Sequence, residues 1–335
     1  MSTNGQVHPL LEVSDLVTRY PIPRGILGTV AGRPQQQVHA VEGISFSLNQ
    51  GEMLALVGES GCGKTTTAQS VMRLVQPDSG SIRFEGSDIS TLGFRELRPL
   101  RKRMQIIYQD PYESLDPRFR VRQTIEEPLV IHGVGTRSDR PHRVKEALVR
   151  AGLTPPELYI DRYPHELSGG QRQRVAIAAS LVLDPKLLVA DEPVSMLDVS
   201  VRAGILGLLD ALRKDGMGIL MITHDLSTAA HFADRIAVMY LGRIVEEGPA
   251  RDVVRNPQHP YTKALISVVP KRDPRDRSEP QILKGETPNP VHIPSGCRFH
   301  PRCPLVTPEC PHIDPELRTP KDGTTPEHRA ACILV

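Results

Sequence analysis

The chain contains three short apolar runs, and each is followed by residues that are candidates for ligand binding or catalysis. Residues 53–57 (MLALV) precede a glycine-rich turn, residues 187–190 (LLVA) precede Asp191 and Glu192, and residues 218–222 (GILMI) lie shortly before His224. Uninterrupted apolar runs of this length are typical of parallel strands that are buried on both faces. Because ligands bind at the carboxyl ends of such strands, the pattern predicts an α/β protein with its site where these runs end.

The rest of the pattern predicts the elements around those strands. Residues 10–18 and 104–109 read as strands, and residues 38–48 alternate apolar and polar positions, as a half-buried antiparallel strand does. Helices are predicted at 66–74, within 123–152 and at 171–183, where Asp184 and Pro185 end the last of them. Residues 21–37 contain Gly and Pro at several positions and are expected to form an exposed loop.

The turn after residues 53–57 matches the nucleotide-binding pattern G-x-x-x-x-G-K-[ST], with a strand before it and a helix after it. Its glycines let backbone N–H groups turn toward phosphate oxygens. Lys64 is expected to bridge the β- and γ-phosphates, and the Thr65 hydroxyl to bind Mg²⁺. Cys62 is interpreted as a spacer, not a nucleophile. The residues of this turn are Gly58, Glu59, Ser60, Gly61, Cys62, Gly63, Lys64, Thr65 and Thr66.

The two acids after residues 187–190 complete a phosphate-transfer site. An acid at the end of an apolar strand is the second part of such a site, so Asp191 is expected to hold Mg²⁺. Glu192, the next residue, is then placed to polarise the attacking water as general base.

The motifs together resemble those of the ATP-binding cassette (ABC) ATPases, over residues 10–250. Residues 167–171 (LSGGQ) resemble the signature motif of that family, and residues 195–198 resemble its D-loop. The resemblance implies that Tyr20 stacks on adenine, Gln109 reaches Mg²⁺ and the water, and His224 contacts the γ-phosphate. The implied fold is a P-loop ABC ATPase, with a RecA-like core, an antiparallel β subdomain and a helical signature subdomain at about residues 110–180.

In the family the signature motif serves ATP held by a second cassette. The resemblance therefore implies that Ser168, Gly169, Gly170 and Gln171 bind the ATP of a partner cassette, either a paralogue or a second copy. ATP would close the cassette dimer and hydrolysis would reset it. Met196 stands where the family more often has Ala, a departure that concerns the contact between the two sites.

One predicted surface and one sequence segment indicate that the chain works with membrane subunits. The surface of residues 108–117 and the following helices is expected to take the coupling helix of a membrane subunit. Residues 256–265 (NPQHPYTKAL) resemble the segment that follows the cassette in ATPases of dipeptide and oligopeptide importers.

The chain is thus expected to comprise a nucleotide-binding domain (1–255) and an importer-type extension (256–335) with a linker at 270–290. Two permease subunits and, through them, an extracytoplasmic solute-binding protein are the implied partners; nickel is an alternative solute.

Four cysteines lie in the extension, Cys297, Cys303, Cys310 and Cys332, with the spacing C-x5-C-x6-C-x21-C. Disulfides are disfavoured in a reducing cytosol, so a four-cysteine centre of zinc or iron–sulfur type is predicted. The spacing lacks the C-x2-C pair usual for zinc. The resemblance to peptide-importer ATPases implies a [4Fe–4S] cluster. His300, His312 and His328 lie nearby in the sequence and keep a mixed-ligand site open.

Composition narrows the class of partner. The chain has 41 basic and 39 acidic side chains, and aromatic residues make up only 4 %, so a nucleic-acid partner is not expected. The N-terminal segment lacks the basic and apolar regions of a signal peptide, and no apolar run approaches the ~20 residues of a membrane helix. We expect a peripheral protein on the cytoplasmic side of the inner or plasma membrane. A soluble ABC ATPase without a transport role is the less favoured alternative.

Overall fold

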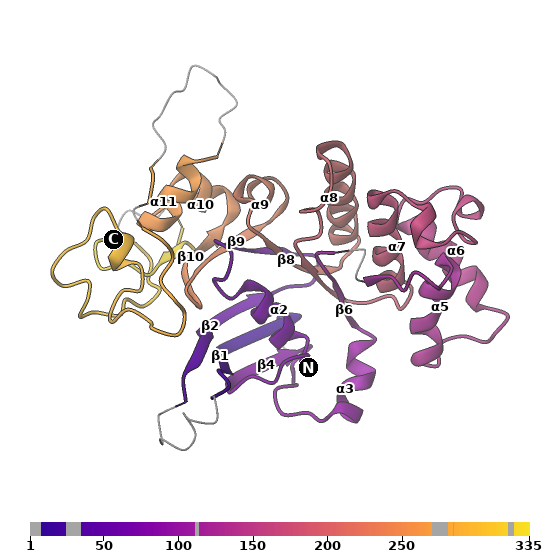
Figure 1. Cartoon of the computed structure of the whole chain (residues 1–335), viewed down its shortest axis with the longest axis horizontal. Helices are drawn as coiled ribbons and strands as arrows, with labels where there is room; N and C mark the ends of the chain where they lie inside the picture. The colour runs from indigo at the N-terminus through magenta and orange to yellow at the C-terminus, as the bar shows by residue number, and fades with distance from the viewer. Residues whose placement is uncertain (1–7, 25–34, 111–113, 270–280, 284, 321–324) are drawn as a thin grey trace, which may run out of the picture. The chain divides into compact units, whose positions relative to one another are not determined.

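The computed structural model describes residues 8–24, 35–110, 114–269, 281–283, 285–320 and 325–335 (Figure 1). Residues 25–34 of the predicted loop, residues 270–280 and 284 of the predicted linker, and residues 111–113 of the predicted coupling surface lie outside the described part. The chain divides into two compact units. The first comprises Met1–Leu11, Leu48–Met53 and Phe84–Ile222, and the second comprises Glu12–Ser47, Leu54–Arg83 and Thr223–Val335.

The first unit is built on three parallel strands and a group of helices. Strand β7 (Leu187–Asp191) lies between β6 (Met104–Ile107) and β8 (Gly218–Thr223), with Met104 and Gly218 both opposite Leu187. Every residue of β7 and β8 is buried, as their apolar sequences predict. The other elements are β5 (Ser87–Asp88), α3 (Phe94–Arg101), α5 (Val121–Ile131), α6 (Arg140–Arg150), α7 (Gly169–Leu181), α8 (Val199–Lys214) and two 3₁₀ turns, Pro156–Leu158 and Pro164–Glu166.

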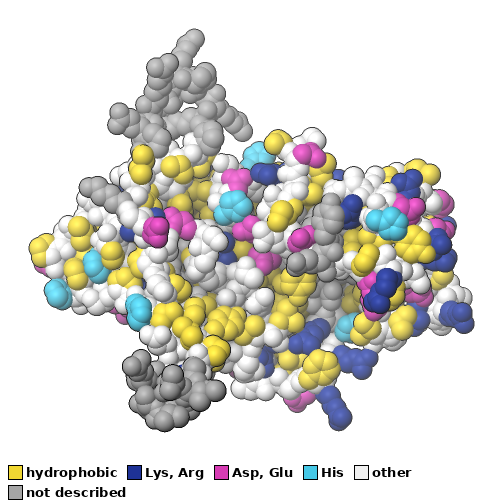
Figure 2. Space-filling model, in the orientation of Figure 1, with side chains coloured by type: hydrophobic (Ala, Val, Ile, Leu, Met, Phe, Trp, Pro, Cys, Tyr) yellow, Lys and Arg dark blue, Asp and Glu magenta, His cyan; other side chains and the backbone are white. Residues whose placement is uncertain are grey.

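Helices α5, α6 and α7 contact one another, and α7 also contacts β6 and α8. The predicted helical stretch 123–152 is two helices, because Gly133 and Gly135 both take left-handed backbone conformations between α5 and α6. Lys and Arg side chains gather over α3, where Arg95 and Arg98 are exposed (Figure 2). Helix α3 therefore presents basic side chains to the surface.

The second unit contains two sheets. In one, β1 (Leu11–Pro21) lies between β2 (Gln37–Leu48) and β4 (Ser79–Phe84). In the other, β3 (Met53–Val57) is parallel to β9 (Arg235–Tyr240), β9 is antiparallel to β10 (Arg243–Pro249), and β10 is antiparallel to β11 (Arg329–Ala330). Its helices are α2 (Lys64–Val71), α9 (Leu226–Phe232), α10 (Ala250–Arg255) and α11 (Pro260–Ser267), with a 3₁₀ turn at His300–Arg302.

Within the second unit, the predicted extension is attached to β10 through a buried carboxylate. Glu246 is fully buried and accepts the backbone N–H groups of Gln258 and His259, each at 2.8 Å. His328 Nε2 lies 2.7 Å from the same carboxylate, and His328 is also fully buried. A buried carboxylate needs such partners, so Glu246 joins the PQHPYT segment and the end of the chain to one strand.

No helix in the described part of the chain has the length and apolarity that crossing a membrane requires.

Candidate functional site

The glycine-rich turn of the second unit connects β3 to α2, as predicted. Lys64 begins α2 and its side chain is buried, with Nζ donating to the carbonyl oxygens of Gly58 (2.8 Å) and Glu59 (2.9 Å). The ammonium is thus held on the inside of the turn. Ser60 and Thr65 are exposed at the turn and at the start of the helix, where backbone N–H groups and the helix dipole favour an anion.

Gly63 can be replaced by no other residue without distorting this turn. Its φ is +107°, and a Cβ atom would lie 2.1 Å from the Ala40 carbonyl oxygen. Both the backbone conformation and the close approach therefore require glycine. Cys62 is buried, which raises the pKa of its thiol, and its Sγ lies 3.7 Å from Lys64 Nζ. A buried thiol of raised pKa is a poor nucleophile, which fits its interpretation as a spacer.

In the first unit, β7 delivers its two acids in different ways. Asp191 is the last residue of the strand and is only 5 % exposed. Glu192 follows with a left-handed backbone (φ +45°), an unfavourable conformation for a residue with a Cβ atom. Its N–H donates to Ile222 O (2.9 Å) and its carbonyl accepts the Ser195 hydroxyl (3.1 Å). This turn ends the strand directly after Asp191, so the Glu192 side chain does not continue the alternation of β7.

Gln109 and Glu192 are brought together in the first unit. Gln109 Nε2 donates to Glu192 Oε2 at 3.2 Å, although 83 residues separate them. Tyr108, next to Gln109, has its pKa raised by burial and by the charge of Asp191. The segment after β6 and the end of β7 therefore form one polar cluster, in which an amide is bonded to the predicted general base.

The signature segment forms the start of α7. Ser168 is the N-cap residue: its hydroxyl accepts the Gln171 N–H (3.3 Å), and Gln171 Oε1 accepts the Ser168 N–H (3.0 Å). This capping box leaves the other N–H groups of the first turn directed out of the helix. Gly170 lets α7 approach α8, since a Cβ atom there would lie 2.3 Å from Val201 Cγ1. Gly169 has more room, its nearest neighbour being Leu197 at 3.7 Å.

The segment between β7 and α8 carries exposed apolar side chains. Asp198 caps α8 by accepting the Val201 N–H at 3.0 Å. Met196 and Val199 flank it and are 62 % and 81 % exposed. Apolar side chains this exposed beside a polar turn are a feature of contact surfaces.

Two further predicted site residues belong to the second unit. Tyr20 lies half-buried near the end of β1, and His224 is exposed directly after β8. Asp225 then caps α9 through the N–H groups of Ser227 (2.9 Å) and Thr228 (3.3 Å). The chain therefore turns sharply after β8, with the imidazole on the outside of the turn.

The four cysteines lie in the second unit and are all unpaired thiols. Burial, with smaller contributions from the charges of the other three cysteines, raises the pKa of Cys297 to about 11, so all four lie within electrostatic range. Cys297, Cys303 and Cys332 each receive a backbone N–H from two residues further on. Cys310 Sγ receives the Thr307 N–H at 3.4 Å.

The described residues contain no group of three His, Cys, Asp or Glu side chains at the mutual distances that one metal ion requires. Among the three histidines near the cysteines, His328 is engaged with Glu246 and His300 Nδ1 lies 2.9 Å from the Cys297 carbonyl. These two rings have structural partners.

A contact between the extension and the phosphate-binding turn was not predicted from the sequence. Arg302 Nη1 donates to Glu59 Oε2 (2.8 Å), and its Nη2 to Glu59 Oε1 (3.2 Å). The Thr287 hydroxyl donates to the same carboxylate at 2.7 Å. Burial alone would raise the pKa of Glu59, but these hydrogen bonds and the Arg302 charge outweigh it, so the pKa is lowered. No local pattern could reveal this pair, because 243 residues separate its members.

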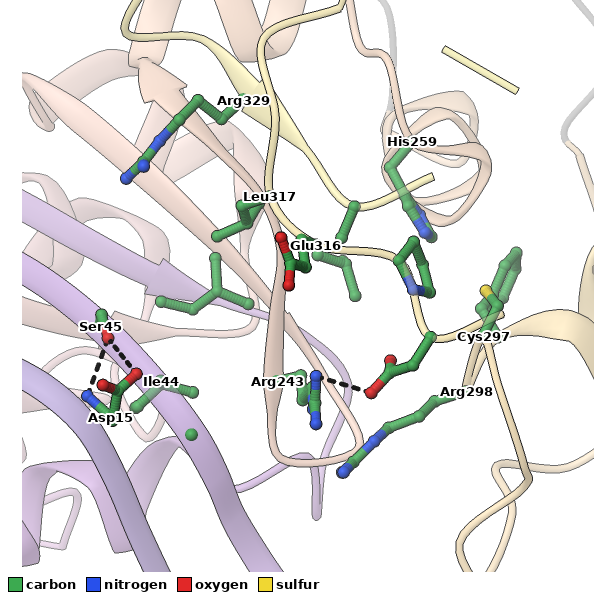
Figure 3. A pocket seen from close by; sticks show the side chains of 17 residues that line it. Asp15, Ile44, Ser45, Arg243, His259, Cys297, Arg298, Glu316, Leu317 and Arg329 are labelled. Carbon is green, nitrogen blue, oxygen red and sulfur yellow. Dashed lines mark hydrogen bonds and ion pairs between the residues drawn. The ribbon is translucent and has the colours of Figure 1, made fainter. Parts of the chain in front are cut away.

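A hollow of about 320 Å³ lies in the second unit, between β2, β10 and the extension. Figure 3 shows the side chains that line it. Two of its acids have partners in the lining: Asp314 pairs with Arg243 (3.0 Å), and Asp15 accepts the Ser45 hydroxyl (3.2 Å). Arg298 donates to a main-chain carbonyl, and burial lowers its pKa to about 10. The hollow is therefore a seam along which the extension is seated, with Cys297 on its wall.

Comparison with known families matches two parts of this chain. Residues 41–195 match the family described as "ABC transporter", and residues 245–310 match "Oligopeptide/dipeptide transporter, C-terminal region". The chain is 45 % identical over 326 residues to a putative peptide import ATP-binding protein of Brucella ovis, covering 97 % of this chain and 98 % of that protein. It is 44 % identical over 329 residues to the oligopeptide transport ATP-binding protein AppF of Bacillus subtilis, covering 97 % of each.

Two solved structures are similar in fold. The ATP-binding cassette MJ0796, a dimer in a post-hydrolysis state bound to ADP and Pi, has a TM-score of 0.61 and 27 % identity, covering 72 % of this chain and 99 % of that one. The cassette cbiO1 of Clostridium perfringens, part of the transporter complex cbiONQ, has a TM-score of 0.62 and 32 % identity, covering 73 % and 90 %. The predicted fold class is thereby confirmed.

Proposed function

The chain belongs to the ATP-binding cassette transporter family, and we propose that it is the ATP-hydrolysing subunit that energises an importer of dipeptides or oligopeptides. The observation that carries this proposal is the similarity over 97 % of the chain to a putative peptide import ATP-binding protein and to an oligopeptide transport ATP-binding protein. The C-terminal match at residues 245–310 supports the same class of solute.

The ATP site is proposed from side chains and backbone groups of known chemistry. Lys64 neutralises phosphate charge, and the turn around it supplies N–H donors. The Thr65 hydroxyl, the Asp191 carboxylate and the Gln109 amide oxygen are hard oxygen donors of the kind that Mg²⁺ prefers, so these residues would hold the ion that neutralises the phosphates. The place of Asp191 at the carboxyl end of β7 supports this role, because ligands of α/β sheets bind at that end of the strands.

Hydrolysis is assigned to Glu192 as general base, supported by its hydrogen bond to Gln109. Gln109 would keep the carboxylate directed at the water, and His224, exposed after β8, would contact the γ-phosphate. Tyr20 would stack on adenine.

The partner cassette is proposed to contact the start of α7. Ser168, Gly169, Gly170 and Gln171 would bind the ATP of the other cassette, since the capped helix directs its N–H groups outward. The exposed Met196 and Val199 supply apolar surface for the same contact. ATP would then act across the dimer, and hydrolysis would release it.

A permease surface is proposed on the first unit. Tyr108, Val130 and Ile131 are 44 %, 53 % and 50 % exposed. A hollow of about 570 Å³, lined by residues 114–119 with Thr124 and Glu127, lies in the region predicted to take a coupling helix. A hollow and exposed apolar side chains in the same part of the chain suit a short helix of a membrane subunit. The chain would thus sit peripherally on the cytoplasmic side of the membrane.

Reconstitution tests this proposal. The chain, co-expressed with two hydrophobic permease subunits, should co-purify with them, and ATP hydrolysis by the complex should rise when a peptide-loaded solute-binding protein is added. Stimulation by a nickel-loaded binding protein, and none by a peptide-loaded one, would show that the solute is nickel and not a peptide. A stable complex with ribosomes or DNA, and none with permeases, would overturn the transport role.

The four cysteines are proposed to hold a [4Fe–4S] cluster, with structural zinc as the alternative. Four thiols in electrostatic range, each accepting a backbone N–H, form a donor set that suits a metal–thiolate centre. The metal would supply positive charge to stabilise four thiolates. A structural role is favoured, because Cys297 lies on the wall of the seam between the extension and β10.

Metal analysis checks the centre. Anaerobically purified chain should contain about four iron and four sulfide per chain and absorb visible light, as expected for one [4Fe–4S] cluster. Cys303→Ser should lower the metal content, while the matched control Cys62→Ser, in the phosphate-binding turn, should leave it unchanged. Stoichiometric zinc in a colourless protein would establish the alternative.

A further inference from the structure

The phosphate-binding turn contains one acid, and the extension controls that acid's charge. Glu59 follows Gly58 in the turn, and its carboxylate receives two hydrogen bonds from Arg302 and one from Thr287. The Arg302 side chain is 9 % exposed and the Glu59 side chain 26 %, so this is a partly desolvated bidentate pair. Such pairs hold geometry more firmly than surface ion pairs do.

The backbone of the same residue is held as well. The Glu59 N–H donates to the Tyr261 hydroxyl at 2.9 Å. The Tyr261 ring contacts Tyr240 and Phe299, with centroids 4.8 Å and 5.4 Å apart. Phe299 is fully buried and lies between Cys297 and Cys303, and Arg302 is adjacent to Cys303. Residues 297–303 are therefore connected to Glu59 in two ways. Phe299 packs on Tyr261, which binds the Glu59 N–H, and Arg302 pairs with the Glu59 carboxylate.

The position of Glu59 makes this contact relevant to phosphate binding. A carboxylate in a turn that binds a triphosphate is repelled by the ligand unless a cation balances it. Lys64, which binds the Glu59 carbonyl, is within electrostatic range of the carboxylate. If Arg302 were absent, the Glu59 carboxylate would compete with the phosphates for the Lys64 charge.

We propose that Arg302 is a positioning residue for ATP: it neutralises Glu59 and fixes the phosphate-binding turn, so that segment 297–303 of the extension controls ATP affinity. The inference rests on the proposed role of residues 58–66 in binding ATP. It assigns the extension an effect on the nucleotide site that is separate from any contact with peptide or permease.

The test compares ATP affinity in the full-length chain, measured by calorimetry with a non-hydrolysable ATP analogue, and steady-state hydrolysis. Arg302→Met should raise the Kd about five-fold or more, while kcat at saturating ATP stays within about two-fold, because Gln109 and Glu192 are untouched. Arg302→Lys, which keeps the charge without the bidentate geometry, should give an intermediate Kd.

A second substitution separates charge from folding. In Arg302→Met/Glu59→Gln the unbalanced carboxylate is gone, so the Kd should recover toward that of the native chain. A variant that merely misfolded would not be rescued by a second change. Arg329→Met is the matched control, because it removes another arginine of the extension, paired with Glu247, that does not touch the turn; its Kd should equal that of the native chain.

The possible failures are distinguishable. Native chain that binds no ATP analogue would overturn the proposed function and this inference with it. Native binding with an unchanged Kd in Arg302→Met would overturn the inference alone. A raised Kd that Glu59→Gln does not relieve would also overturn it, because the charge of Glu59 would then not be what Arg302 controls.

Discussion

Replacing Glu192 with Gln is expected to lower ATP turnover by about 10²- to 10⁴-fold, the usual range for loss of a general base. The amide has nearly the same shape as the carboxylate and can still pair with Gln109, which lies 3.2 Å from Glu192 Oε2. It cannot accept a proton from water at neutral pH. The left-handed backbone at residue 192 is unchanged by the substitution, so the end of β7 should keep its geometry.

Binding and hydrolysis should therefore separate in this variant. The Kd for ATP should stay within about two-fold of the native value, and the variant should accumulate as an ATP-bound dimer, measured by size-exclusion chromatography with Mg²⁺-ATP. The control Glu146→Gln, at an exposed position on α6, should leave turnover unchanged. Turnover near the native rate in Glu192→Gln would show that another group is the base.

The apolar runs predicted the buried strands well because burial on both faces leaves a strong local signal. β3 spans Met53–Val57 as predicted, and β7 and β8 each extend one residue past their apolar runs, to Asp191 and Thr223. Helix ends were predicted less well. α2 ends at Val71, short of the predicted residue 74, because Arg73 takes a left-handed conformation (φ +53°). Nothing in an arginine side chain indicates that conformation beforehand.

Sequence motifs pointed to the candidate site residues, but not to the contacts that connect them. The order of motifs pointed to Gln109 and Glu192 separately, and their direct hydrogen bond depends on β6 and β7 lying side by side. The Glu59–Arg302 pair carried no sequence signal, because either residue alone reads as a solvated charge. The PQHPYT segment was assigned by resemblance, and its physical reason is the buried Glu246 that it satisfies.

Replacing Lys64 with Ala should weaken ATP binding and turnover together, by contrast with Glu192→Gln. Lys64 is 5 % exposed, and its Nζ is held by the carbonyls of Gly58 and Glu59. A hydrogen bond to a charged group contributes about 1.5–3 kcal/mol, and about 1.4 kcal/mol corresponds to ten-fold in Kd. The Kd for ATP should therefore rise about 10- to 100-fold, with a further loss in kcat because the γ-phosphate loses its cation.

Lys186→Ala is the control for Lys64→Ala. It removes a surface lysine that is paired with Glu85 at 2.7 Å. That control should leave the Kd within about two-fold, so a general loss of positive charge would be excluded as the reason. ATP should lose more affinity than AMP in Lys64→Ala, because only ATP has the β- and γ-phosphates that Lys64 is proposed to bridge. An equal loss for both nucleotides would mean that the substitution deforms the turn as a whole. An unchanged Kd for ATP would remove Lys64 from the phosphates.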